Sequence, residues 1–130
     1  MVSDDWDRRE ESGTAGVKMK PKAPKISEAQ FQRTVIEAAQ RLGWLVHHVR
    51  AGLNRRGQWS TAVSGNVGFF DLVLAHRNSP SVVLAELKTE KGVLSDAQRI
   101  WWNVVSNGTT EVHVWRPSDW PSIESRLKNP

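Results

Sequence analysis

Apolar residues recur along this chain with two spacings, which separate predicted helices from predicted strands. A spacing of three or four residues predicts an amphipathic helix over residues 28–42, carried by Phe31, Val35, Ala38, Ala39 and Leu42. Runs rich in β-branched and aromatic residues predict four strands, over residues 44–50, 69–75, 82–88 and 111–116. Two further helices are predicted, one between Ser95 and Asn107 and a short one over residues 119–127.

Capping signals support the two longer helices. Ser27 and Ser95 are each followed three residues later by a glutamine, Gln30 and Gln98, which is the capping-box pattern. Residues 51–68 are rich in Gly, Asn, Arg and Ser and predict a long loop without structure of its own. The predicted order α, β, β, β, α, β, α indicates an α/β fold with a mixed central sheet flanked by helices.

Composition limits the function classes. With 130 residues and no cysteine, the chain fits one domain, over residues 26–130, without disulfides or cysteine-ligated metals. No apolar run approaches the roughly 18 residues that span a bilayer, and the first residues lack the apolar centre of a secretory signal. We therefore expect a cytoplasmic protein, in a bacterial or phage-infected cell, with no membrane partner.

The charge balance is basic and favours a polyanionic partner. Eighteen Lys and Arg residues against fourteen Asp and Glu residues give a net charge of +4. Residues 1–25 mix charges with few apolar residues and predict a disordered arm, which ends in four lysines spaced by prolines and small residues. This arm is either a solvated linker or an extended segment that lies along phosphates.

The strongest chemical signal lies on the predicted hairpin of residues 69–75 and 82–88. Glu86 and Lys88 share one strand face, and the neighbouring strand can bring Asp71 beside them. Two carboxylates close together repel each other unless a cation lies between them, and Mg²⁺ binds one or two carboxylates while keeping waters and phosphate oxygens. The pattern therefore predicts a Mg²⁺ site, with Mn²⁺ as a substitute, and a lysine that orients or deprotonates an attacking water.

These residues also carry a family resemblance. Gly68-Phe69-Phe70-Asp71, followed by Ala85-Glu86-Leu87-Lys88, resembles the D…ExK core of the PD-(D/E)XK nuclease superfamily. The flanking segments make the chain similar to the VRR-NUC branch, the virus-type replication-repair nucleases, over about residues 26–128; these segments begin at Ser27, Gly43, Leu94 and Val114. Phe70 departs from the pattern, since the family usually has proline before the aspartate.

The resemblance implies a restriction-endonuclease-like core, αβββαβ, and a role for each matching residue. Asp71 and Glu86 would ligate the metal, the Leu87 carbonyl would be a further ligand, and Lys88 would handle the water. Glu28 matches the helical glutamate that lies beside the metal directly or through water, with Glu37 as the weaker candidate. Gln98 matches the glutamine that often follows the core.

Each of these residues also has a purely structural interpretation. Glu86 and Lys88 could be a same-face ion pair, and Asp71 could be a turn residue. A negative charge such as that of Glu28 is favoured at a helix N-terminus regardless of function. The capping box alone gives Gln98 a complete structural role.

A second cluster of candidate residues suits phosphate contacts and base stacking. The residues predicted to contact DNA are His48, Arg50, Arg55, Arg56, Trp59 and Lys91. A solvated basic loop is the alternative. In the tandem Trp101-Trp102, we expect Trp101 in the core and the other ring free for a dimer contact or for DNA.

We therefore expect a Mg²⁺-dependent DNA endonuclease that acts on branched or junction DNA in replication, repair or recombination. A two-fold substrate such as a four-way junction favours a homodimer. Two alternatives stay open: a non-catalytic DNA-binding accessory protein on the same fold, and a sequence-specific restriction nuclease.

Overall fold

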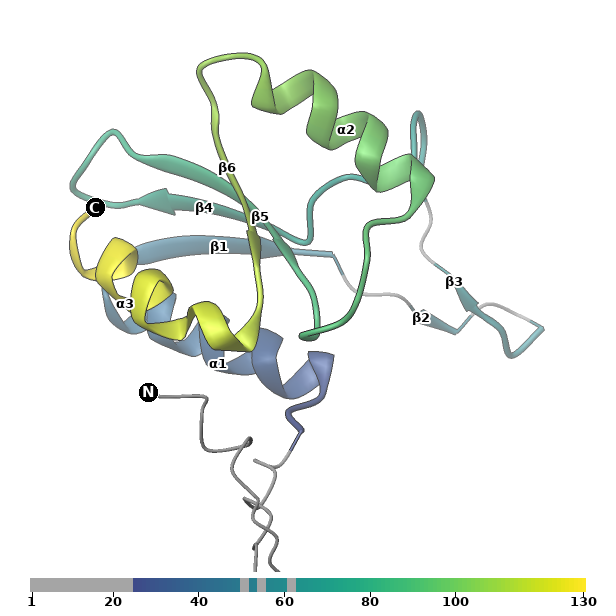
Figure 1. Ribbon diagram of the computed structural model, residues 1–130, viewed down its shortest axis with the longest axis horizontal. Helices are drawn as coiled ribbons and strands as arrows, with labels where there is room; N and C mark the ends of the chain where they lie inside the picture. The colour runs from purple at the N-terminus through teal and green to yellow at the C-terminus, as the bar shows by residue number, and fades with distance from the viewer. Residues whose placement is uncertain (1–24, 50–51, 54–55, 61–62) are drawn as a thin grey trace, which may run out of the picture.

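The computed structural model describes residues 25–49, 52–53, 56–60 and 63–130. In these residues the chain forms three α-helices, a four-stranded sheet and a small hairpin (Figure 1). The elements are α1 (Glu28–Arg41), β1 (Trp44–His48), β2 (Gly52–Leu53), β3 (Trp59–Ser60), β4 (Leu72–His76), β5 (Val82–Leu87), α2 (Asp96–Ser106), β6 (Glu111–Trp115), a 3₁₀ turn η2 (Pro117–Asp119) and α3 (Trp120–Lys128). Apart from Lys25, the predicted arm lies outside the described residues.

Both predicted capping boxes are present and set the starts of α1 and α2. The Ser27 hydroxyl accepts the Gln30 N–H and the Gln30 side chain accepts the Ser27 N–H, at 3.1 and 3.0 Å. Ser95 and Gln98 repeat both contacts, at 3.1 and 2.9 Å. Each box satisfies two N–H groups that the first turn of a helix leaves without an intrahelical partner.

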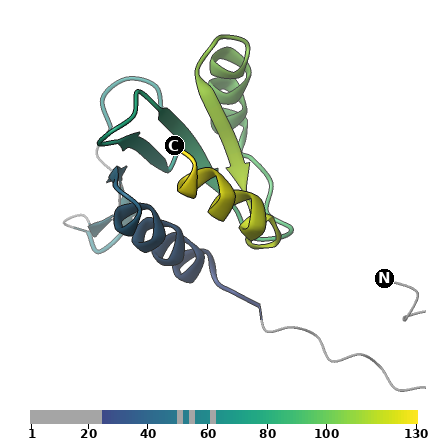
Figure 2. The same ribbon diagram turned by 90° about the vertical axis from the view of Figure 1, so that its left-hand side faces the viewer.

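The sheet is mixed, in the order β1-β4-β5-β6, as the sequence pattern predicts for an α/β fold. β1 pairs antiparallel with β4, β4 antiparallel with β5, and β5 parallel with β6. Helices α1 and α3 cover one face of the sheet and α2 lies on the other (Figures 1 and 2). The parallel pair needs a crossover connection, and α2 supplies it.

The hydrophobic core lies between the sheet and the α1/α3 layer. Trp44 is 1% exposed, and its indole Nε1 donates to the Leu127 carbonyl at 3.0 Å, which ties β1 to α3. The fully buried side chains of β4 and β5 point to this face, among them Leu72, Leu74, Val83 and Leu87. The described part of the chain has no helix with the length and apolar character needed to cross a bilayer.

Some of the predictions about strands, loops and burial are wrong. The strand predicted over residues 69–75 begins only at Leu72, because the Phe69 and Phe70 rings turn to contact Trp101 and Trp102 at centroid distances of 4.9 and 6.2 Å. Residues 51–68 contain the antiparallel β2–β3 hairpin and so are not a loop without structure. Trp101 is partly exposed rather than in the core, since α2 buries none of its residues fully.

Candidate active site

The register of the central hairpin brings the two carboxylates to one end of one sheet face. Leu72 pairs with Ala85, so Asp71 and Glu86 lie opposite each other one position beyond that pair. Directly opposed residues of an antiparallel pair point to the same face. Lys88 follows on that face, with its Nζ 3.9 Å from Glu86 Oε2. The cluster lies where β5 ends and the chain leaves towards α2.

Asp71 is held by the strand that carries its partners. It precedes β4 and is half-buried, and its Oδ2 accepts the Leu87 N–H at 2.8 Å. The Asp71 carboxylate thus satisfies the backbone N–H of Leu87, at the end of β5 and beyond the Leu72–Ala85 pair. This contact fixes the Asp71 carboxylate next to residues 86–88.

Glu86 is the one charged side chain that the described residues bury, with 2% of its surface exposed. Burial is the largest cause that raises the pKa of its carboxyl, and the Asp71 carboxylate raises it further. The Lys88 ammonium lowers this pKa and offsets only part of the rise, which leaves it at about 8. Without a further cation, the site therefore favours a protonated Glu86 at neutral pH.

Gln98 forms the predicted helix cap and also contacts Glu86. Its Oε1 accepts the Ser95 N–H at 2.9 Å and completes the capping box. Its Nε2 donates to Glu86 Oε2. One amide group therefore joins the start of α2 to the buried carboxylate.

The structure does not bring the Glu28 carboxylate into this cluster. Glu28 is exposed in the first turn of α1, where its Oε2 accepts from Gln32 Nε2 at 3.4 Å. Glu37 is also exposed. Among the residues that the structure describes, no three His, Asp or Glu side chains gather closely enough to hold a metal ion. The cluster therefore contains two carboxylates, from Asp71 and Glu86.

The residues predicted to contact DNA are only partly placed. His48 ends β1 and is half-buried, while Arg56 and Lys91 are exposed. Trp59 lies in β3, and Arg50 and Arg55 lie outside the described residues. The structure thus presents an exposed Lys91 on the turn that follows Lys88.

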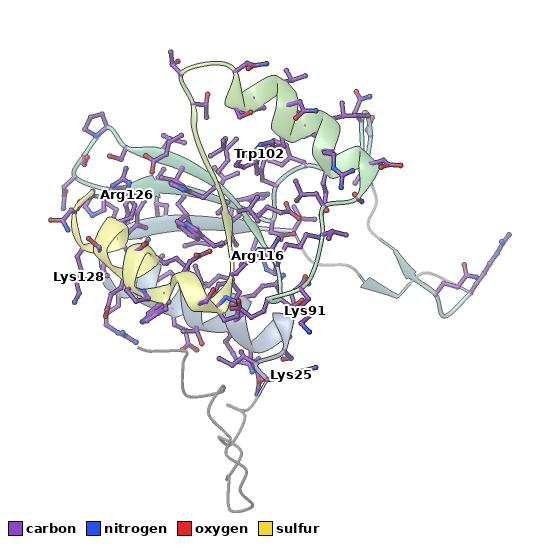
Figure 3. The ribbon with its side chains drawn as sticks, in the orientation of Figure 1. Lys25, Lys91, Trp102, Arg116, Arg126 and Lys128 are labelled. Carbon is purple, nitrogen blue, oxygen red and sulfur yellow. The ribbon has the colours of Figure 1, made fainter. Side chains whose placement is uncertain are left out.

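Arg116 is a residue of the site for which the sequence predicted no role. Its Nη1 donates to the carbonyls of Thr89 and Gly92 at 2.6 and 2.7 Å and lies 3.3 Å from that of Glu90. Figure 3 shows Arg116 and Lys91 at this turn. A single guanidinium therefore holds the backbone that follows Lys88. Only its place at the end of the last predicted strand could have suggested this contact.

We expect Arg116→Ala to loosen this turn. Loss of charge-assisted bonds to partly buried carbonyls should lower the free energy of unfolding by roughly 1.5–3 kcal/mol. Amide hydrogen exchange over residues 89–92 should accelerate at least about tenfold. Arg99→Ala is the control, because the contacts of Arg99 are exposed: a hydrogen bond to the Leu94 carbonyl at 3.1 Å and an ion pair with Asp96 at 3.7 Å. Equal exchange in the two variants would contradict the assignment.

The comparisons with known proteins give no family. No protein-family model matches this chain, and no curated protein or solved structure matches it either.

Proposed function

We propose that this protein is a metal-dependent DNA endonuclease with a restriction-endonuclease-like core, similar to the VRR-NUC nucleases of the PD-(D/E)XK superfamily. The observation that supports the proposal is the meeting of Asp71, Glu86 and Lys88 at one end of the β4–β5 hairpin. The α/β architecture with a mixed four-stranded sheet is compatible with that core.

The donor set of the site fits Mg²⁺ or Mn²⁺. The Asp71 carboxylate raises the pKa of the buried Glu86 carboxyl, and a divalent cation between the two would remove this repulsion. Mg²⁺ takes one or two carboxylates and completes its shell with water and phosphate oxygens, so a third carboxylate is not required. Asp71 and Glu86 would hold the ion, with the Leu87 carbonyl as a further ligand. The bound ion would supply Lewis-acid stabilisation of a phosphate oxygen and a more acidic water.

The neighbouring side chains have distinct roles in the proposed hydrolysis. The Lys88 ammonium, 3.9 Å from Glu86, orients the attacking water and stabilises negative charge on the pentavalent phosphate. Gln98 fixes the orientation of the Glu86 carboxylate through its Nε2. Phe70 is 5% exposed and packs near Trp102, so the residue in place of the usual proline has a packing role beside Asp71.

We further propose branched or junction DNA as the substrate. The net charge of +4 and the exposed Lys91, three residues after Lys88, favour contacts with phosphates. Contacts of this kind fix the position of a backbone and carry no sequence information of their own. A preference for the shape of the DNA is therefore expected over a preference for its sequence.

The direct test incubates the full chain with labelled junction, flap and linear duplex DNA, in Mg²⁺ or in EDTA. We expect nicking near the branch in Mg²⁺ only. Complete absence of metal-dependent nicking, with retention of DNA, would support a binding protein on the same fold instead. Cuts at fixed sequences in linear duplex would support a restriction-type enzyme.

Lys88→Ala should reduce the single-turnover rate by roughly 10²–10³-fold, because it removes a positive charge aimed at the reacting phosphate. Lys128→Ala is the matched control, since Lys128 is an exposed lysine that pairs with Glu124 at 3.5 Å on α3. It should leave the rate unchanged. An active Lys88→Ala variant would remove Lys88 from the proposed mechanism.

A further inference from the structure

Helix α2 presents apolar residues on a side that nothing in the described chain covers. Its inner side carries Gln98, which contacts Glu86, and Trp102, which lies near Phe70. Ile100 is 65% exposed and Val104 is 70% exposed. Because successive helical residues are rotated by about 100°, Ile100 and Gln98 lie on roughly opposite sides of the helix.

These residues form part of a larger patch, here called the α2 patch, made of Val67, Phe69, Ala97, Ile100, Trp101 and Val104. Val67 is 61% exposed and Phe69 is 42% exposed, and the Phe69 ring contacts that of Trp101 at 4.9 Å. A hollow of about 410 Å³ lies between the helix and the segment before β4, lined by Asn66 and five of the patch residues. Trp101 Nε1 donates to the Val67 carbonyl at 3.0 Å, so the polar atom of the indole is satisfied within the chain. What the patch offers a partner is therefore apolar surface.

We propose that the α2 patch is a self-association surface whose occupant is the α2 patch of a second copy of this chain. A two-fold interface is self-complementary, so each copy must present both a protrusion and a hollow. The α2 patch has both: the prominent Ile100 and Val104 side chains, and the hollow that they border. Ala97, Ile100, Trp101 and Val104 follow the i, i+3, i+4, i+7 spacing with which antiparallel helices pack.

Charge and area favour a second copy over DNA. No charged side chain lines the hollow, so pairing brings no like charges together, and a phosphate backbone would find no cation there. The largest apolar patch on a monomer is typically about 300–600 Å². Two such patches would bury roughly 600–1,200 Å², which reaches the lower limit of about 1,000–1,200 Å² for specific interfaces. The dimer is accordingly weak and dependent on concentration.

This surface is independent of the proposed chemistry, but it has a consequence for that chemistry. Gln98 and Ile100 belong to one rigid helix, and Gln98 contacts Glu86. Pairing through α2 therefore fixes the distance and orientation between two carboxylate clusters. Two sites held in this way would suit a substrate with two-fold symmetry.

Sedimentation equilibrium of the full chain, without DNA and from about 2 to 200 μM, tests the proposal. We expect a monomer–dimer equilibrium in the wild type and at least a 50-fold higher dissociation constant for Ile100→Glu and for Val104→Glu. Val93→Glu is the matched control, because Val93 is 73% exposed and lies outside the α2 patch. It should dimerise like the wild type. Circular dichroism will verify that each variant keeps its helices.

A cross-linking experiment locates the contact. The chain has no cysteine, so Ile100→Cys introduces a single thiol, which should form a disulfide-linked dimer under mild oxidation. Glu124→Cys, on α3, should stay monomeric under the same conditions.

Three results would overturn the proposal. The first is a monomer at every concentration, and the second is a dimer that Ile100→Glu leaves intact. The third is a monomer whose DNA affinity falls on Ile100→Glu, which would place the patch in a nucleic-acid interface instead. None of these results depends on whether the protein cuts DNA.

Discussion

Glu86→Gln is expected to abolish Mg²⁺-dependent cleavage and, in metal-free buffer at pH 8.5, to make the protein more stable than the wild type. The two effects have one origin. A carboxylate with 2% exposure beside Asp71 is unfavourable when ionised, and this is what raises its pKa to about 8. Glutamine keeps the size of the side chain and removes the charge. It also removes a proposed metal ligand.

The pH dependence of this gain in stability follows from linkage. Between the ordinary glutamate pKa of 4.5 and the folded-state pKa of about 8, the folded chain holds a proton that the unfolded chain has released. The contribution of Glu86 to the stability of the wild type is therefore fully present below pH 4.5 and is lost as pH rises to 8. Glutamine does not ionise, so the Glu86→Gln variant does not lose this stability. The difference in free energy of unfolding between the variant and the wild type should therefore grow over that pH range to about 2–4 kcal/mol, or roughly 10 °C in Tm.

Thermal unfolding from pH 5 to pH 9, with EDTA or with Mg²⁺, measures the effect. Added Mg²⁺ should raise the Tm of the wild type at pH 8 and leave that of Glu86→Gln unchanged. Two results would contradict these expectations. A Tm of Glu86→Gln below that of the wild type at every pH would contradict an unfavourable ionised Glu86, and no response of either protein to Mg²⁺ would contradict the proposed metal site.

Glu111→Gln provides a control of opposite sign in the same sheet. Hydrogen bonds from Arg126, at 2.8 Å to each oxygen, and from His113 lower the pKa of Glu111 to about 2. This carboxylate stabilises the fold above pH 4.5, and its contribution is lost as pH falls towards 2. Glu111→Gln should therefore be less stable than the wild type at neutral pH, with unchanged cleavage.

The sequence predicted those features that depend on local patterns. Each capping box needs a serine and a glutamine three residues apart, and both form as expected. The meeting of Asp71 with Glu86 needs only strand alternation and a hairpin, which short-range spacing carries. The sequence could not decide between a cap and a site contact for Gln98, because two atoms of one amide perform the two roles.

Features that depend on distant packing were not predictable. Phe69 and Phe70 read as strand residues, yet contacts with two tryptophans on α2 draw them out of the ladder. The Arg116 contacts join residues 24 to 27 positions apart, with backbone carbonyls that carry no sequence signal. The position of Glu28 depends on where α1 lies against the sheet, and helical spacing says nothing about that.

Gly68→Ala is expected to be among the most damaging substitutions of a small residue in this chain. Gly68 has φ +94, and a Cβ at this position would lie 2.5 Å from the backbone carbonyl carbon of Ala97 and 2.7 Å from its oxygen. Helix backbone cannot yield as a flexible side chain does. The first turn of α2 would have to move away, and Gln98 with it.

Gly65→Ala separates this clash from backbone strain. Gly65 has φ +96, but its Cβ would meet no atom within 4 Å. Both variants carry the cost of a left-handed residue, about 1–2 kcal/mol, while Gly68→Ala adds overpacking of about 1–3 kcal/mol. Urea unfolding measures the difference. At a temperature where both variants are folded, Gly68→Ala should also cleave more slowly than Gly65→Ala, because a displaced Gln98 releases the Glu86 carboxylate. Equal stability and equal rates would mean that α2 tolerates the shift and that its contact with Glu86 does not position the site.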